Sequence, residues 1–399
     1  MHFYIILLTT LVVGCNAKNE LIKNDIEDDS TLTTPELIAK YKYPIENHYV
    51  ETSDGYILNL HRIPNYGKKE ATRKELPVYL QHGIECSSAD WVTPGPKKGL
   101  PYLLADRGYD VWLGNNRGNR YSRNHTTLDP KRDAKNFWNF SWHEIGMIDV
   151  PEMIDYILSV TNKTSLYHIG HSQGTTTYYV MCSERPEYNT KVEAHISLAP
   201  IGYMNHAVSP VIRFAALFQK LLQVLIKLFR SYELLPQGNL LNLYLKNNCK
   251  PGKLQFICSD FLFMIFGFGK DQLNTTLLPV VLNHFPAGSS SKQAIHYMQE
   301  MNSGKFRQYD YGLIKNKIKY NSITPPNYKL ENISSKVYLF WSKNDWLSHE
   351  KDVKRLAERL PNSEEILINN PKWTHLDYLW GIDVVPMVYD IVFEKLEQH

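Results

Sequence analysis

The 399-residue sequence lacks an excess of charge of one sign, and its few long apolar runs are too short or too interrupted by charges to span a bilayer. Its 44 basic and 41 acidic residues are scattered, without the basic stripe that nucleic-acid binding needs. A hydrophobic content of 43% excludes disorder for most of the chain. The chain is longer than one ordinary domain of about 150 residues, so we expect a large domain with an additional region.

Cysteine is also scarce, with five residues in the chain, which excludes a small disulfide scaffold. Cys15 lies in the N-terminal apolar segment. Cys249 and Cys258 are separated by turn residues and can close a short loop in an oxidising compartment, stabilising the fold by about 2–3 kcal/mol. Cys86 and Cys182 are expected to lie on separate elements and to be free thiols.

The N-terminus has the pattern of an export signal. Phe3 to Gly14 is an apolar run, and small residues follow it for cleavage after Ala17, so residues 1–17 are predicted to be a signal peptide. No Lys or Arg precedes the run, and its end at Cys15 also resembles a bacterial lipoprotein signal, so an uncleaved anchor or a lipoprotein is the alternative. Residues 18–35 are polar and acidic and are expected to form a loose tail without catalytic residues.

Five Asn-X-Ser/Thr sequences agree with passage through a glycosylating secretory pathway, although such triplets also arise by chance. They are expected to carry glycans at Asn124, Asn139, Asn162, Asn274 and Asn332. The predicted location is secreted, with the lysosome as the alternative.

Strand-like and helix-like stretches alternate along most of the chain, which predicts an α/β protein with a mostly parallel sheet. The expected strands are Tyr56–Ile63, Val78–His82, Tyr109–Leu113, Leu166–Ile169, Ala194–Leu198, Val337–Trp341 and Glu365–Ile368. The expected helices are Leu100–Arg107, Trp142–Val160, Gln173–Cys182, His349–Leu360 and Val384–Leu396. The alternation stops in an apolar, helical interval, so we assign residues 36–201 and 326–399 to the core and 202–325 to a cap.

The sequence GHSQG holds Ser172 between Gly170 and Gly174. It follows a predicted strand and precedes a predicted helix, which is the strand, sharp turn and helix of a nucleophile elbow. Glycines suit both flanking positions because side chains would collide where the strand and the helix crowd together. The context therefore predicts that Ser172 is a nucleophile at a helix N-terminus, where developing negative charge is favoured.

A serine hydroxyl needs a base, and this fold supplies an acid and then a histidine after later strands. Asp345 follows one predicted strand and His375 follows the next, so Ser172, Asp345 and His375 form the predicted triad of an α/β-hydrolase fold. Taken alone, a loop Asp is commonly a helix cap and a loop His a solvated side chain. The weaker candidates are His171, His349 and Asp377.

The oxyanion of an acyl-transfer intermediate needs hydrogen-bond donors. The backbone N–H of Gln173, directly after the nucleophile, and that of Ile84, in the loop after Val78–His82, are the candidates. A plain turn is the alternative interpretation of the His82-Gly83 pair. The reaction requires no metal and no cofactor.

From about Tyr49 to the C-terminus the chain resembles the acid lipases, the group of gastric and lysosomal acid lipases and their insect relatives. The resemblance rests on ETSDGYIL, LQHGIECSSADW, YDVWLGNNRGNRYS, FWNFSWHEIGMIDVPEMIDYI, IGHSQGTT, KNDWL and THLDYLWG. It implies the same triad, the same two oxyanion donors and a disulfide between Cys249 and Cys258. The cap departs most from the family, which leaves the substrate preference open.

Val211–Arg230 has the length of a membrane span but carries four charges, which predicts one amphipathic helix with a wide apolar face. It is expected either to pack on the core or also to make transient contact with a lipid–water interface. Phe261–Phe268 adds further apolar surface. The predicted substrate is a long-chain lipid ester, an acylglycerol or a sterol ester; a short-chain carboxylesterase and a non-catalytic lipid carrier are the alternatives.

Overall fold

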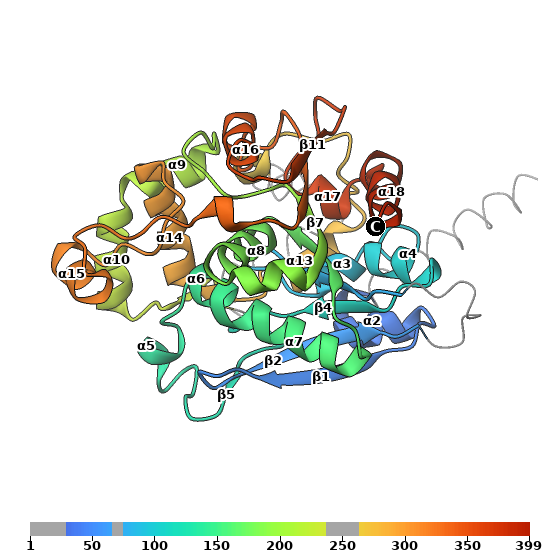
Figure 1. Cartoon of the computed structure of the whole chain (residues 1–399), viewed down its shortest axis with the longest axis horizontal. Coiled ribbons are helices and arrows are strands. Elements are labelled where there is room, and N and C mark those ends of the chain that lie inside the picture. The colour runs from blue at the N-terminus through green and yellow to red at the C-terminus, as the bar shows by residue number, and fades with distance from the viewer. Residues whose placement is uncertain (1–28, 66–74, 237–262) are drawn as a thin grey trace, which may run out of the picture.

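A twisted sheet forms the centre of the computed structural model, which describes residues 29–65, 75–236 and 263–399 (Figure 1). Its strand order is β1-β2-β4-β3-β6-β7-β10-β11, and the short β5 pairs with β2 at one end. β2 runs antiparallel to both of its neighbours, β1 and β4, whereas the strands from β4 to β11 are parallel. The strands are β1 (Glu46–Glu51), β2 (Tyr56–Ile63), β3 (Val78–Gln81), β4 (Val111–Gly114), β5 (Asn124–His125), β6 (Leu166–His171), β7 (Val192–Leu198), β10 (Lys336–Trp341) and β11 (Ser363–Leu367).

All seven predicted strands are present, with ends that differ by a few residues, and the predicted mostly parallel α/β architecture is confirmed. β1 and β5 of this sheet were not predicted from the sequence. The side chains of β1 are mostly exposed or half-buried because it is an edge strand, so its sequence ENHYVE lacks a buried apolar face.

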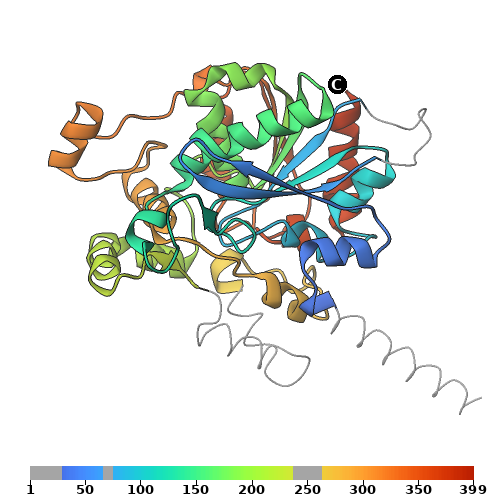
Figure 2. The same ribbon diagram turned by 90° about the horizontal axis from the view of Figure 1, so that it is seen from below.

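Helices cover both faces of the sheet (Figure 2). One face packs against α6 (Trp142–Glu144), α7 (Val150–Thr161) and α8 (Gln173–Glu184). The other packs against α2 (Thr34–Lys40), α3 (Ala89–Val92), α4 (Leu100–Asp106), α17 (Asp377–Trp380) and α18 (Asp390–Glu397). Neighbouring strand residues alternate between the two cores, as Tyr79 and Leu80 of β3 do, because successive side chains of a strand point to opposite faces.

The predicted helix Trp142–Val160 is present but contains a π-helical turn at Ile145–Asp149. Pro151 has no N–H to donate to the carbonyl of Met147, which Arg185 Nη1 approaches at 3.4 Å instead. The proline was therefore a local signal for this irregularity.

The cap region lies between β7 and β10. It contains α9 (Pro210–Leu217), α10 (Gln219–Phe229), β8 (Glu233–Leu234), α13 (Leu278–His284), β9 (Ser289–Ser290), α14 (Ser291–Ser303) and α15 (Leu313–Tyr320). The segments Met1–Ala17 and 18–28, and both Cys249 and Cys258, lie outside the described residues. Among the described helices, none is long and apolar enough to cross a membrane.

The expectation of one continuous helix over Val211–Arg230 is wrong, because the segment breaks at Phe218 into α9 and α10. Neither proline nor glycine causes the break. The side chain of Asn302 in α14 donates to the carbonyl of Ala216 at 2.8 Å, and in a continuous helix that carbonyl would accept the N–H of Lys220. A residue distant in sequence thus ends α9.

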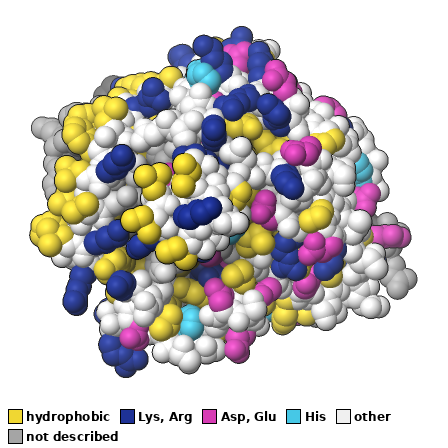
Figure 3. Space-filling model, turned by 60° about the vertical axis from the view of Figure 1, so that its left-hand side comes forward, with side chains coloured by type: hydrophobic (Ala, Val, Ile, Leu, Met, Phe, Trp, Pro, Cys, Tyr) yellow, Lys and Arg dark blue, Asp and Glu magenta, His cyan; other side chains and the backbone are white. Residues whose placement is uncertain are grey.

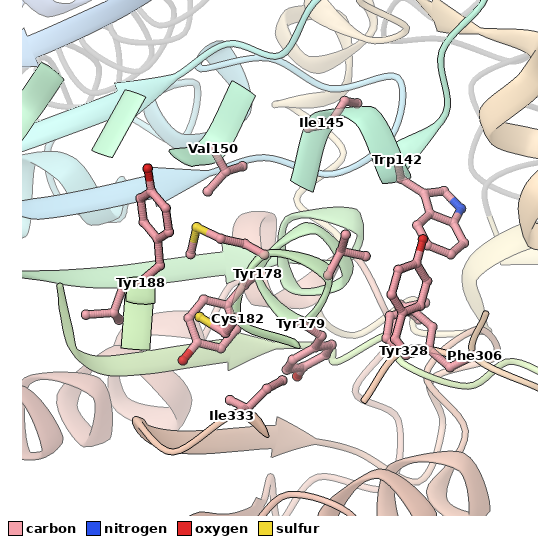
Figure 4. Packing of buried hydrophobic residues seen from close by; sticks show 14 of the residues in the cluster. Trp142, Ile145, Val150, Tyr178, Tyr179, Cys182, Tyr188, Phe306, Tyr328 and Ile333 are labelled. Carbon is pink, nitrogen blue, oxygen red and sulfur yellow. The ribbon is translucent and has the colours of Figure 1, made fainter. Parts of the chain in front are cut away.

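Aromatic rings join the cap to the core beside α6 (Figure 4). The Trp142 ring stacks on His296 of α14 with centroids 3.6 Å apart, and it also contacts Phe306 and Tyr328. Burial of these large rings ties α14 firmly to the core.

Candidate active site

Ser172 lies in a sharp turn between β6 and α8 and has φ 53° and ψ −119°, a conformation that costs energy for a non-glycine residue. A Cβ at Gly174 would lie 2.2 Å from the carbonyl oxygen of Gln81 in β3, and one at Gly170 would lie 2.7 Å from the carbonyl of Gly174. The two glycines therefore allow the close approach of strand and helix that the sequence predicted. The turn presents the serine hydroxyl at the N-terminus of α8.

His375 lies between Ser172 and Asp345. Its Nε2 is 2.8 Å from the Oγ of Ser172, and its Nδ1 is 2.8 Å from Oδ2 and 3.0 Å from Oδ1 of Asp345. With Nδ1–H donating to the carboxylate, Nε2 carries the lone pair that accepts the hydroxyl proton of Ser172. All three side chains are buried or nearly so. The structure thus brings together three residues that the sequence spreads over two hundred positions.

The carboxylate of Asp345 is fixed by its own loop. Its Oδ1 accepts the backbone N–H groups of Leu347 at 2.9 Å and Ser348 at 2.8 Å. These bonds orient the carboxylate towards His375.

The three weaker candidates have other contacts. His171 donates from Nε2 to the backbone carbonyl of His375 at 2.9 Å, and burial lowers its pKa to about 3, so the neutral ring positions the loop of His375. His349 caps α16 (Glu350–Ala357) by accepting from Lys351 N–H. Asp377 accepts from the backbone N–H of Thr374 at 2.6 Å, and burial raises the pKa of its carboxyl to about 7.

Ile84 and Gln173 both lie beside Ser172, and Ile84 lines the cavity above it. Among the described residues, no group accepts a hydrogen bond from the backbone N–H of either residue. Both donors are therefore available to an oxyanion.

His82 fixes the loop that carries Ile84, a function that the sequence analysis missed. Its Nδ1 donates to the carbonyl of Gly83 at 2.7 Å, while Nε2 accepts from Asn116 N–H at 3.1 Å and from Asn119 Nδ2 at 3.0 Å. Burial lowers the pKa of His82 to about 4, so the ring is neutral, as this bonding pattern requires. The two asparagines come from the loop after β4, and only the folded chain brings them to His82.

Glu85 connects the same loop to the cap. Its carboxyl accepts from Ser289 Oγ at 2.5 Å and from Gly288 N–H at 3.3 Å, and its backbone carbonyl accepts from Ala287 N–H at 2.6 Å. Burial raises the pKa of this carboxyl to about 8. The residue has φ 58°, so the loop is held in a left-handed conformation at its junction with the cap.

The cap also touches the loops of Asp345 and His375. The Phe266 ring stacks on the imidazole of His375 at 5.9 Å, and the carbonyl of Phe266 accepts from His375 N–H at 3.4 Å. Asn344 Nδ2 donates to the carbonyl of Phe268 at 2.8 Å. A short cap segment therefore contacts the loop of the acid and the loop of the histidine at once.

Above Ser172 lies a cavity of about 280 Å³. Its walls combine residues of the core with residues of the cap, and most of them are apolar. They include Ile201, Met204, Leu234, Ile265, Leu282 and Met298. The hydroxyl of Ser172 and the imidazole of His375 are among the few polar groups that face it, so the cavity suits an apolar group attached to a reactive carbonyl.

Of the predicted sequons, Asn124, Asn139 and Asn162 are exposed, whereas Asn274 and Asn332 are half-buried. The Asn332 amide donates from Nδ2 to the carbonyl of Ser183 at 2.9 Å. Cys86 and Cys182 are buried free thiols, as predicted.

Known protein families match the chain in two overlapping regions. Residues 34–95 match the family described as a partial alpha/beta-hydrolase lipase region, and residues 77–247 match the alpha/beta hydrolase fold. A putative lipase from Sulfolobus solfataricus, 15% identical, covers 90% of this chain and 99% of its own with a TM-score of 0.54, which agrees in fold. The predicted α/β-hydrolase fold is thereby confirmed, and the class of protein is a serine ester hydrolase.

Relatives with higher identity define the family more closely. Lipase 1 of Drosophila melanogaster is 43% identical over 95% of this chain and 83% of its own length. Lipase lipl-1 of Caenorhabditis elegans is 38% identical over 93% of each chain, and the lysosomal acid lipase/cholesteryl ester hydrolase of Rattus norvegicus is 34% identical over 94% and 93%. The chain belongs to the acid lipase family of α/β-hydrolases, as its motifs predicted.

Proposed function

We propose that the protein hydrolyses the carboxylic ester bonds of lipids by a two-step serine mechanism. The observation that supports it most directly is the line of hydrogen bonds from Ser172 Oγ through His375 to Asp345, on the floor of an apolar cavity. In the first step His375 takes the proton of Ser172 as the hydroxyl oxygen attacks the ester carbonyl. The Asp345 carboxylate stabilises the imidazolium that forms.

The tetrahedral intermediate places its negative oxygen near the N–H groups of Ile84 and Gln173. His375 then gives its proton to the departing alcohol, which leaves an acyl group on Ser172. Water repeats the sequence: His375 removes its proton, the acyl–oxygen bond to Ser172 breaks, and the serine recovers a proton while the fatty acid leaves. No step uses a metal or a cofactor.

The substrate that fits best is an ester with a long acyl chain, from an acylglycerol or a sterol ester. The support is the apolar lining of the cavity and the cap that covers it. The lysosomal acid lipase/cholesteryl ester hydrolase name of one relative agrees with both ester classes. A short-chain carboxylesterase would not need so much apolar wall.

Rates on emulsified long-chain esters and on soluble short-chain esters test this substrate class. We expect long-chain acylglycerols or cholesteryl esters to be hydrolysed with the higher kcat/KM. A strong preference for soluble short-chain esters would favour the carboxylesterase alternative.

The catalytic part of the proposal has its own test. A serine-directed organophosphonate should label the protein at Ser172, and Ser172→Ala should abolish both labelling and turnover while leaving the free energy of unfolding nearly unchanged. An unlabelled but lipid-binding protein would instead be a non-catalytic carrier.

We also propose that α9 and α10 make transient contact with the lipid–water interface that presents the substrate. Seven large apolar side chains of the two helices and of the break between them are more than 40% exposed; they are Phe214, Leu217, Phe218, Leu221, Val224, Leu228 and Phe229. The alternative of a helix buried on the core would have covered these residues.

Export, glycosylation and the disulfide form a further part of the proposal, with secretion as the destination and the lysosome as the alternative. Mass spectrometry of protein from a eukaryotic secretory host should find a chain that begins after Ala17, glycans on the sequons and a bond between Cys249 and Cys258. The exposure of Asn124, Asn139 and Asn162 favours these three sites, while the inward bond of Asn332 disfavours that one. A reduced Cys249 in such material would contradict the disulfide.

A further inference from the structure

A second cavity, of about 590 Å³, forms a groove between the cap and residues 135–139 of the core, and it shares no lining residue with the cavity above Ser172. One wall comes from α10 through Gln223, Ile226 and Lys227, and the other comes from α15 through Lys315 and Lys319. Figures 1 and 2 place both helices at the same end of the molecule. The proposed ester hydrolysis assigns no task to this groove.

Basic residues dominate the charge around the groove. Lys135, Lys227 and Lys315 line it, and none of the three makes an ion pair with any described residue. The one carboxylate in the lining, that of Asp310, already accepts from Gly312 N–H at 2.9 Å and from Asn316 Nδ2 at 2.8 Å. The uncompensated positive charge at the rim attracts an anion.

The floor of the groove is closed by a half-buried lysine and aromatic rings. Lys292 donates from Nζ to the carbonyl and the side-chain oxygen of Asn139, each at 3.3 Å, and to the hydroxyl of Tyr311 at 3.2 Å. Its Nζ is also 3.8 Å from Oε1 of Glu144. Because these partners satisfy Lys292, an incoming anion would meet the lysines of the rim first.

The surface beside the groove is both apolar and basic. On α15, Leu313, Ile314 and Ile318 are 68%, 79% and 81% exposed. No Asp or Glu lies between Ser209 and Tyr232 or between Tyr311 and Leu330, whereas both segments carry several Lys or Arg. Figure 3 shows hydrophobic and basic side chains interspersed over the left half of this side of the molecule. We call α10, α15 and the groove between them the cationic cap face.

Helices with exposed apolar side chains and flanking lysines bind the surface of membranes that contain anionic lipids. A free anion in solution would use the lysines but would have no need of the exposed isoleucines of α15. A neutral lipid surface would use the isoleucines but would gain nothing from the lysines. The combination identifies one occupant, a lipid surface that carries negative headgroups.

We propose that the cationic cap face binds an anionic phospholipid surface, with headgroups seated in the groove and the apolar side chains of α15 inserted among the acyl chains. The inference rests on the proposed function only in that a lipid substrate is presented at such a surface. It adds a headgroup site and a second lipid-contacting helix to the contact already proposed for α9 and α10.

Sedimentation with vesicles tests the proposal without turnover, in a Ser172→Ala background from which N-linked glycans have been removed, because Asn139 lines the groove. We expect tight, salt-sensitive binding to phosphatidylcholine vesicles that contain phosphatidylserine, and weak binding to phosphatidylcholine alone. Exchanging Lys135, Lys315 and Lys319 together for Gln should weaken binding to the anionic vesicles about a hundredfold, since each lysine near such a surface contributes a factor of about five.

A matched control removes the same charge elsewhere, by exchanging Lys97, Lys98 and Lys163 for Gln, and should bind as the parent does. Ile314→Ser combined with Ile318→Ser should weaken binding without changing the net charge. Equal binding of the groove variant and the parent, equal loss in the matched control, or equal binding of the parent to both kinds of vesicle would overturn the proposal. Hydrolysis of a soluble short-chain ester by the groove variant with Ser172 restored should be unchanged, which separates this test from that of the triad.

Discussion

The loops that carry the catalytic triad and the cationic cap face differ in the burial and the bonding of their side chains. The side chains of Ser172, Asp345 and His375 are buried and hydrogen-bonded to one another or to the surrounding backbone. On α10 and α15, large apolar side chains are exposed, and Lys135, Lys227 and Lys315 at the groove make no ion pair with a described residue. The first arrangement holds reacting groups in place before the substrate arrives, and the second leaves surface available for a partner.

The largest effect should come from a substitution in the catalytic triad. Asp345→Asn keeps the shape of the side chain, but its amide can donate to His375 and so favours the wrong tautomer. We expect kcat to fall by about four orders of magnitude, as measured on a soluble ester. Asp377→Asn is the matched control, because Asp377 accepts from the backbone N–H and the hydroxyl of Thr374 instead of from the imidazole; a loss of the same size there would contradict the assignment.

The free energy of unfolding should depend on pH through Glu85, which connects the loop of Ile84 to the cap. Burial raises the pKa of its carboxyl from 4.5 to about 8 in the folded chain, so the folded state binds the proton more tightly than the unfolded state. Its contribution to stability is complete below pH 4.5 and is lost as pH rises towards 8. The free energy of unfolding of the parent should therefore fall relative to that of Glu85→Gln by about 1.4 kcal/mol per pH unit in this window.

Urea unfolding of both proteins at pH 4.5, 6 and 8 would measure that difference. The values at pH 4.5 serve as the reference, because the carboxyl is then protonated in the folded chain and half protonated in the unfolded chain, so most of its contribution is still present. A constant difference across the range would show that the carboxyl is not the cause.

A side chain at Gly174, in the sharp turn that holds Ser172, should lower the free energy of unfolding moderately. Gly174→Ala places a Cβ 2.2 Å from the carbonyl oxygen of Gln81, which belongs to the backbone of β3 and cannot swing aside. We expect a loss of about 1–3 kcal/mol in the free energy of unfolding, as for other overpacked cores, measured by chemical denaturation. An unchanged midpoint would mean that α8 can move away from β3.

The smallest effect is expected on the cap face. Ile318→Ser removes an apolar side chain that is 81% exposed, so the free energy of unfolding should change by less than about 0.5 kcal/mol. Ile157→Ser, at a fully buried position of α7, should cost about 2–5 kcal/mol. Similar losses in the two variants would show that α15 packs against something in solution.

The same contrast separates what the sequence could predict from what it could not. Ser172, Asp345 and His375 were predicted because each follows an apolar strand, and the carboxyl ends of parallel strands meet at one edge of the sheet. The glycines of the elbow gave a local reason for the sharp turn. Each of these positions is marked by a strand and the few residues beside it, so the sequence could predict that the three side chains come together.

Long-range partners explain the failures. The break at Phe218 depends on Asn302, the state of His82 depends on Asn116 and Asn119, and nothing near any of these positions signals the contact. β1 was missed because an edge strand with half-buried polar side chains lacks a clear pattern.

The contacts of Phe266 and Phe268 with the loops of His375 and Asn344 have a consequence for engineering. A chimaera that exchanges the cap for one from another lipase, with the aim of changing which lipids are accepted, also exchanges part of the support of the imidazole. Selectivity and turnover would then change together, and grafts that retain Phe266 and its neighbours offer the way to separate them.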